Sequence, residues 1–181
     1  MSGTRALRHY LRSGGVIAYP TESCFGLGCD PSNRRAVQRL LAIKGRPERK
    51  GLILIAGKFA QLKPYLAPLP SSQISKLHTQ WPGPHTWLVP ASHNCPFWLT
   101  GRHPTIAVRV TAHQPAARLC NEAGMALVST SANRSGQVPA KTTRQCKMLF
   151  GDQVKVIAGR VGKRRKPSTI QDLATGKIIR P

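Results

Sequence analysis

Short apolar runs alternate along this chain with segments whose apolar residues recur at helical spacing. The clearest run, residues 51–56 (GLILIA), carries no polar side chain and is bounded by glycine, which is typical of a buried strand. Because strand patterns and helix patterns interleave through the whole chain, the sequence predicts an α/β fold with a mixed sheet covered by helices.

The predicted elements follow from apolar periodicity and from the positions of glycine and proline. The predicted strands are 16–19, 51–56, 86–89, 105–110 and 125–128, with shorter ones near 154–157, 168–172 and 177–180. The predicted helices are 4–13, 33–43 with Asn33 as its cap, 58–66, 71–80, 114–123 and 142–149. The predicted loops are 21–30, 91–104 and 129–141.

Length and composition favour one domain over residues 1–181, because 181 residues with 40% hydrophobic content can bury one sizeable core. No run approaches the roughly 18 apolar residues that span a bilayer, and the N-terminus lacks a secretory pattern. We expect a cytoplasmic protein without membrane partners. The five cysteines are scattered without metal-ligand spacing, so we expect free thiols and no metal site.

Positive charge dominates the chain: 28 Lys and Arg residues stand against 6 Asp and Glu, a formal net charge of +22. Such an excess attracts polyanions and gives salt-dependent affinity for nucleic acid. The cations are spread along the chain, so a merely solvated basic surface remains the alternative explanation. The densest run, residues 162–167, is predicted to be a surface loop that contacts tRNA.

Three polar clusters, at 19–28, 44–50 and 129–136, lie beside predicted buried strands, where α/β proteins usually form ligand sites. In the second cluster, Pro47 ends the helix and fixes a chain direction in which Arg46 can grip a phosphate bidentately. The third offers hydroxyl and amide donors without bulk. Composition alone favours an ordinary turn for the first cluster, and a serine-rich turn is the alternative for the third. For Lys44 the alternative is a cation that complements the helix dipole. The chain contains neither GxxxxGK[ST] nor GxGxxG.

Taken in order, YPTESCFGLGCDP, KGRPERKGLILIA, TIAVRV, LVSTSANRSG, PSTI and IIRP resemble the YrdC-like threonylcarbamoyl-AMP synthases from about residue 14 onward. The most specific marks are the KxR of Lys44 and Arg46 and the SxN of Ser131 and Asn133. The resemblance, to the short single-domain form of the family, implies a twisted sheet with a basic concave face. It also implies a nucleotidyltransferase that makes L-threonylcarbamoyl-AMP and pyrophosphate from L-threonine, bicarbonate and ATP.

The resemblance further implies which residues act. Residues with an implied catalytic role are Lys44, Arg46, Ser131 and Asn133. Those implied to bind ATP are Arg46, Lys50, Thr105, Ser131, Asn133 and Arg180, and those implied to bind threonine are Ser23, Arg109, Ser129 and Ser168. Arg109 would pair with the threonine carboxylate. Mg²⁺ is expected with ATP, held mostly by phosphate oxygens and water.

The implied product feeds threonylcarbamoyladenosine synthesis in tRNA, so tRNA and the proteins that transfer the threonylcarbamoyl group are expected partners. The main alternative is a non-catalytic factor that binds double-stranded RNA or tRNA or assists ribosome maturation, which the high charge also suits. A third option, carbamoyl transfer to another acceptor, would need carbamoyl phosphate or an added acceptor domain.

Overall fold

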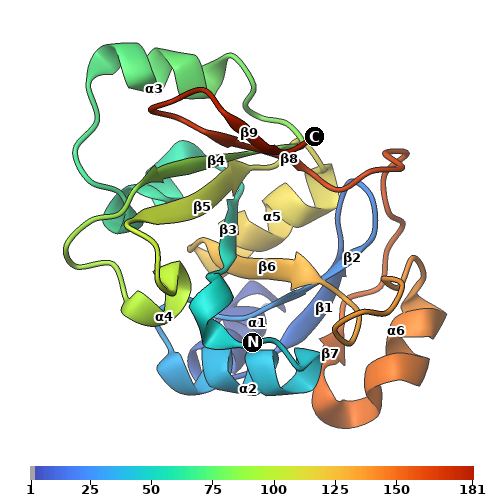
Figure 1. Cartoon of the computed structure of the whole chain (residues 1–181). Coiled ribbons are helices and arrows are strands. Elements are labelled where there is room, and N and C mark those ends of the chain that lie inside the picture. Colours follow the sequence, from blue (N-terminus) through green and yellow to red (C-terminus); the bar gives the residue numbers. More distant parts are fainter. Residues whose placement is uncertain (1–2) are drawn as a thin grey trace.

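The computed structural model describes residues 3–181, in which strands form one mixed sheet with helices around it (Figure 1). The strands are β1 (Ile17–Pro20), β2 (Phe25–Gly28), β3 (Ile53–Ala56), β4 (His85–Pro90), β5 (Thr105–Val110), β6 (Leu127–Ser131), β7 (Lys155–Val156), β8 (Thr169–Asp172) and β9 (Ile178–Arg180). The α-helices are α1 (Gly3–Arg12), α2 (Arg34–Lys44), α3 (Ser71–His78), α4 (Phe97–Thr100), α5 (Gln114–Ala123) and α6 (Thr143–Phe150). The 3₁₀ turns are η1 (Glu48–Lys50), η2 (Phe59–Gln61), η3 (Lys63–Tyr65) and η4 (Gly151–Gln153).

The sheet order is β7-β1-β2-β6-β3-β5-β4-β8-β9. Three pairs, β1–β7, β3–β5 and β4–β8, are parallel, and the other five pairs are antiparallel. The predicted α/β class with a mixed, helix-covered sheet is therefore confirmed. Strand β6 lies between β2 and β3 although it follows them by about 70 to 100 residues, a placement that local periodicity does not encode.

The two faces of the sheet bury different clusters. Alternation along β3 sends Leu54 and Ala56 into the larger core, to which α2, α3 and α6 contribute, and sends Ile55 to the opposite face. There Ile55 packs in a smaller cluster with α1 and α5. Leu11 of α1 is fully buried in that cluster, which contributes about 1.5–3 kcal/mol relative to exposure. The rest of this second face is not covered by α1 or α5, and it carries the cavity described below.

Several predicted elements match the structure closely. Helix α5 spans the predicted 114–123, and Asn33 caps α2 by accepting a hydrogen bond at Oδ1 from the backbone N–H of Ala36 (3.1 Å). The helix predicted at 58–66 is instead the two 3₁₀ turns η2 and η3. Pro64 lies in that segment and has no N–H to donate to a continuing α-helix.

Three predicted loops contain regular structure, so those predictions were wrong in part. The predicted loop 21–30 contains strand β2. This strand was not predicted because it contains two glycines, and glycine usually weakens a strand. Here a Cβ on Gly28 would stand 2.7 Å from both Tyr19 Cε1 and the carbonyl oxygen of Val128, so close packing excludes a side chain. The loop 129–141 begins with the last three residues of β6, and the loop 91–104 contains α4.

No helix in the described part of the chain is long and apolar enough to cross a membrane. Within residues 3–181, no three His, Cys, Asp or Glu residues lie together in a way that could hold a metal ion. The five cysteines are free. That the chain forms one domain over residues 1–181 stays a prediction.

Candidate active site

A cavity of about 590 Å³ opens on the second face of the sheet, beside the cluster formed with α1 and α5. It is lined by residues of the β1–β2 turn, the α2–β3 connection, β5, β6 and β9. All eleven site residues predicted from the sequence line this one cavity: Ser23, Lys44, Arg46, Lys50, Thr105, Arg109, Ser129, Ser131, Asn133, Ser168 and Arg180. Their individual roles stay predictions.

Lys44 is the last residue of α2, which stops because Gly45 adopts a left-handed conformation (φ 64°), so the prediction that Pro47 ends this helix was wrong. The side chain is buried, and Nζ reaches four acceptors: the carbonyl oxygen and Oγ of Ser131 (2.6 and 3.2 Å) and the carbonyl oxygen and Oδ1 of Asn133 (3.2 and 2.8 Å). Burial, with a smaller contribution from the nearby Arg46, lowers the pKa of Lys44 to about 8. The ammonium group thus fixes the end of β6 while keeping a positive charge near neutral pH.

Arg46 lies two residues beyond Lys44, and backbone carbonyls hold its guanidinium. Nε and Nη2 donate to the carbonyl oxygen of Gly51 (3.3 and 2.9 Å), and Nη2 also approaches that of Lys50 at 3.4 Å. These bonds engage one edge of the guanidinium, so the other amino group is available to an anion. Burial lowers the pKa of Arg46 from its usual value, yet arginine remains protonated at any physiological pH.

The end of β6 supplies hydroxyl groups along the cavity. Ser129, Thr130 and Ser131 all line it, and Ser131 Oγ donates to Asn133 Oδ1 (2.7 Å). The amide nitrogen of Asn133 in turn donates to the carbonyl oxygens of Arg134 and Gln137 (2.9 and 2.7 Å), which fixes the turn after the strand. Ser131 and Asn133, the two residues of the SxN pattern, therefore belong to one hydrogen-bonded network that includes Lys44.

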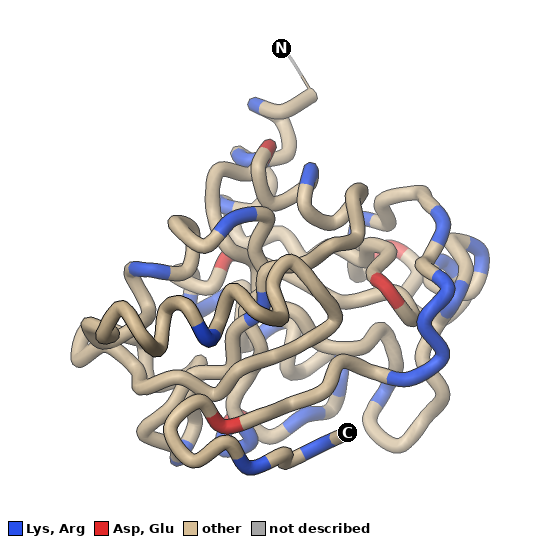
Figure 2. The backbone as a smooth tube through the Cα atoms, turned by 90° about the horizontal axis from the view of Figure 1, so that it is seen from above, with Lys and Arg blue, Asp and Glu red and all other residues tan. Residues whose placement is uncertain are grey.

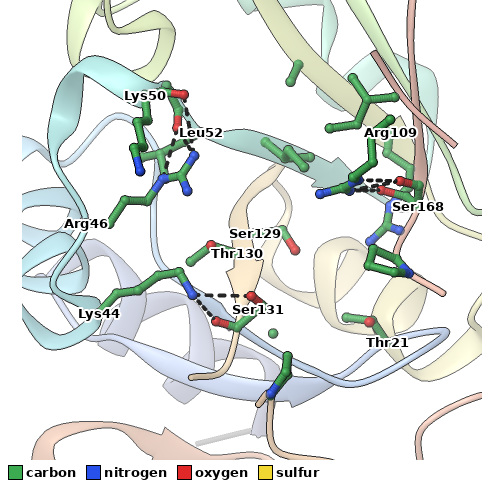
Figure 3. A pocket seen from close by; sticks show the side chains of 18 of the residues that line it. Thr21, Lys44, Arg46, Lys50, Leu52, Arg109, Ser129, Thr130, Ser131 and Ser168 are labelled. Carbon is green, nitrogen blue, oxygen red and sulfur yellow. Dashed lines mark hydrogen bonds between the residues drawn. The ribbon is translucent and has the colours of Figure 1, made fainter. Parts of the chain in front are cut away.

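Arg109 and Ser168 lie across the cavity from Lys44 and Arg46, with Ser129 and Thr130 between the two sides (Figure 3). Arg109 projects from β5 and is buried, with Nη1 3.5 Å from Oε2 of Glu22. Glu22 does not line the cavity itself. The two cationic ends suit a ligand with separated negative groups.

Arg180 of β9 connects the C-terminal strands to the same cavity. Its Nε and Nη2 donate to the carbonyl oxygen of Ser168 (3.0 and 2.8 Å), and Nη2 lies 3.2 Å from Ser168 Oγ. Ser168 Oγ also shares a 2.9 Å hydrogen bond with Thr86 Oγ1. Burial lowers the pKa of Arg180, and the nearby charges of Arg109 and Arg46 lower it further. The family resemblance implies different ligands for Arg180 and Ser168, and the structure joins these two residues by hydrogen bonds.

Five Lys or Arg residues line the cavity, and no Asp or Glu of residues 3–181 does. This composition favours an anionic ligand. The predicted basic character of the whole concave face stays a prediction. The apolar part of the lining, which includes Leu88, Leu99 and Ile170, was not predicted from the sequence.

This fold and cavity define a class of protein: an α/β binding protein with a mixed sheet and a pocket for an anionic small molecule. A family model named Sua5/YciO/YrdC and described as "Telomere recombination" matches residues 9–181. The chain therefore belongs to the Sua5/YciO/YrdC family.

Curated relatives are similar over nearly the whole chain. A protein of Methylobacillus flagellatus named threonylcarbamoyl-AMP synthase is 67% identical over 98% of both chains. One of the same name from Thiobacillus denitrificans is 58% identical over 96% of this chain and 93% of its own length. A crystal structure of P. abyssi Sua5 complexed with L-threonine superimposes with a TM-score of 0.89 at 30% identity, covering 98% of this chain and 53% of the other. This chain thus spans about half of that Sua5 chain.

Proposed function

We propose that this protein is a threonylcarbamoyl-AMP synthase, a nucleotidyltransferase that converts L-threonine, bicarbonate and ATP into L-threonylcarbamoyl-AMP and pyrophosphate. The observation that carries the proposal is the cavity itself, in which all eleven family-pattern residues surround one space lined by five cations. Two curated relatives at 67% and 58% identity have this name, and the structurally similar Sua5 was crystallised with L-threonine. A volume of about 590 Å³ also suits a ligand of nucleotide size.

In the proposed reaction, threonine lies on the side of the cavity formed by Arg109, and the phosphates of ATP lie on the side formed by Lys44 and Arg46. The amine of threonine attacks bicarbonate to give a carbamate and water, and Arg109 holds the threonine carboxylate. A carbamate oxygen then attacks the α-phosphorus of ATP, and the bond from that phosphorus to the β-phosphate oxygen breaks. Charge develops on phosphoryl oxygens, so positioning and neutralisation by Lys44 and Arg46 supply the catalysis, without a covalent nucleophile.

The smaller polar groups orient the reactants. Ser131, Asn133, Thr105 and Arg180 would contact the nucleotide, and Ser23, Ser129 and Ser168 would contact threonine. Mg²⁺ would enter as part of the ATP substrate, because none of the described residues that line the cavity offers a carboxylate to hold the ion.

The test is release of pyrophosphate from ATP, measured with L-threonine and bicarbonate and with each omitted. We expect turnover that requires both. Arg46→Ala should lower turnover by about 100-fold or more, since removal of one preorganised donor to a transition state has that effect. Arg49→Ala is the matched control: Arg49 is exposed in η1 and does not line the cavity, so its loss should change turnover by less than about twofold. ATP turnover that does not depend on threonine would refute the proposal.

The proposed partners beyond the substrates are tRNA and the proteins that transfer the threonylcarbamoyl group, in a cytoplasmic setting. The net charge of +22 supports contact with a polyanion, and Figure 2 shows Lys and Arg in many parts of the fold whereas Asp and Glu are few. The same charges support the alternative of a non-catalytic RNA-binding factor. If RNA binds tightly and salt-sensitively while pyrophosphate release is absent, that alternative is the better description.

A further inference from the structure

Glu22 is a buried acidic residue that the proposed reaction leaves without a role. It lies in the turn between β1 and β2 and is 9% exposed. Its Oε1 accepts a 2.7 Å hydrogen bond from Thr111 Oγ1, just beyond β5, and its Oε2 lies 3.5 Å from Arg109 Nη1. Carboxylates are rarely buried unless they are paired, so the position of this side chain depends on its contacts with Thr111 and Arg109.

The contact between Glu22 and Arg109 is incomplete. Within residues 3–181, neither Oε2 of Glu22 nor Nε of Arg109 has a hydrogen-bond partner, although both atoms are buried. A buried donor without an acceptor is costly to the ligand-free protein. Burial also keeps Nε out of reach of a molecule in the cavity, so a ligand would meet the guanidinium through its terminal amino groups, of which Nη1 is approached by Glu22.

The backbone around Glu22 is fixed as well. The carbonyl oxygen of Glu22 accepts from Arg164 N (3.1 Å), and that of Thr21 accepts from Gly162 N (2.9 Å). A Cβ on Gly162 would stand 2.7 Å from the carbonyl oxygen of Glu22, so the two segments pack with no room between them. The turn therefore cannot shift without moving residues 158–167, the segment that leads to Ser168.

We propose that Glu22 is a positioning residue: it holds the guanidinium of Arg109 by Nη1 so that the other amino group, Nη2, faces the α-carboxylate of the amino-acid substrate. This inference rests on the proposed function, in which that substrate is L-threonine. Glu22 thus sets the affinity for the amino acid and not that for the nucleotide. If the Glu22 carboxylate instead competed with the substrate carboxylate for Arg109, removing its charge would strengthen threonine binding.

The first measurement is steady-state kinetics of Glu22→Gln, which keeps the size of the side chain and removes its charge. We expect the KM for L-threonine to rise about tenfold or more while the KM for ATP changes by less than about twofold. Thr111→Val removes the hydroxyl that orients Glu22 and should shift the KM for threonine in the same direction by less. Glu122→Gln, the same chemical change on α5 away from the cavity lining, should leave both constants unchanged.

The second measurement separates positioning from a general loss of structure. Binding of L-threonine and of L-threoninol, the analogue whose carboxylate is replaced by an alcohol, is measured by calorimetry without ATP. Glu22→Gln should weaken threonine binding and leave threoninol binding unchanged. Equal losses for both ligands, tighter threonine binding, or no threonine binding by the wild type would overturn the positioning role. If the wild type binds threonine but releases no pyrophosphate, the proposed function fails, while the binding data still decide the role of Glu22.

Discussion

Raising the pH should weaken ATP binding through Lys44, because burial lowers the pKa of that ammonium group to about 8. With this pKa, the protonated fraction of Lys44 in the free protein falls about tenfold between pH 7 and pH 9. A unit charge 4 Å from a phosphate oxygen contributes about 4 kcal/mol at an effective dielectric constant of 20, so neutral Lys44 would bind ATP far more weakly. The affinity should therefore follow the protonated fraction and fall about tenfold over this range.

The assay is calorimetric titration with α,β-methylene-ATP, whose bond between the α- and β-phosphates resists cleavage. At pH 8 about half a proton should be taken up for each ligand bound, which is read from the change in enthalpy between buffers of different ionisation enthalpy. The matched variant is Lys44→Arg, whose guanidinium stays charged at pH 9. Its affinity, whatever its absolute level, should not change between pH 7 and pH 9. A wild-type affinity that is constant over this range, or an equal slope in Lys44→Arg, would refute the reasoning.

Two further predictions concern the stability of the fold, and a third concerns the contact between Arg180 and Ser168 in the cavity. Gly28→Ala should lower the free energy of unfolding by about 1–3 kcal/mol in urea titrations, because its Cβ meets backbone of β6, whereas Gly3→Ala, with nothing within 4 Å, should be nearly neutral. Asn33→Ala removes the cap of α2 and should cost about 1 kcal/mol by the same measurement. Arg180→Lys keeps the charge but loses the paired hydrogen bonds to Ser168, so the KM values for ATP and for threonine should both rise. An effect on the ATP constant alone would contradict the link between Arg180 and Ser168.

The elements that could be predicted are those whose own residues decide their structure. Helix α2 has a cap, an apolar face and a terminal glycine, and β3 is apolar throughout, so local rules suffice for both. Strand β2 was missed because Gly26 and Gly28 argue against a strand. At Gly28 the lack of a side chain is required by Tyr19 and by the neighbouring strand β6, which come from elsewhere in the chain.

The candidate site could be predicted only in part, and for a related reason. Lys44 and Arg46 stand out in the sequence because a proline and a glycine surround them. The hydrogen bonds that fix Lys44 reach Ser131 and Asn133, 87 and 89 residues away, whereas those of Arg46 go to Lys50 and Gly51 nearby in the chain. Glu22 gave no such signal, since its partner Thr111 is also 89 residues distant. Family resemblance identified the cavity residues, but it did not indicate what supports them.

The concentration of cations in the cavity works against the folding of the ligand-free protein. Arg46 and Arg180 lose water on burial, which lowers the pKa of both, and the charges of Arg109 and Arg46 lower that of Arg180 further. Carbonyl oxygens of Gly51 and Ser168 offset part of this cost, yet they bring no negative charge. An anion with several charges, such as a triphosphate, would neutralise groups that come from α2, β5 and β9. Ligand binding and the stability of the sheet are therefore coupled, because the same charges that attract the substrate oppose the fold until it is bound.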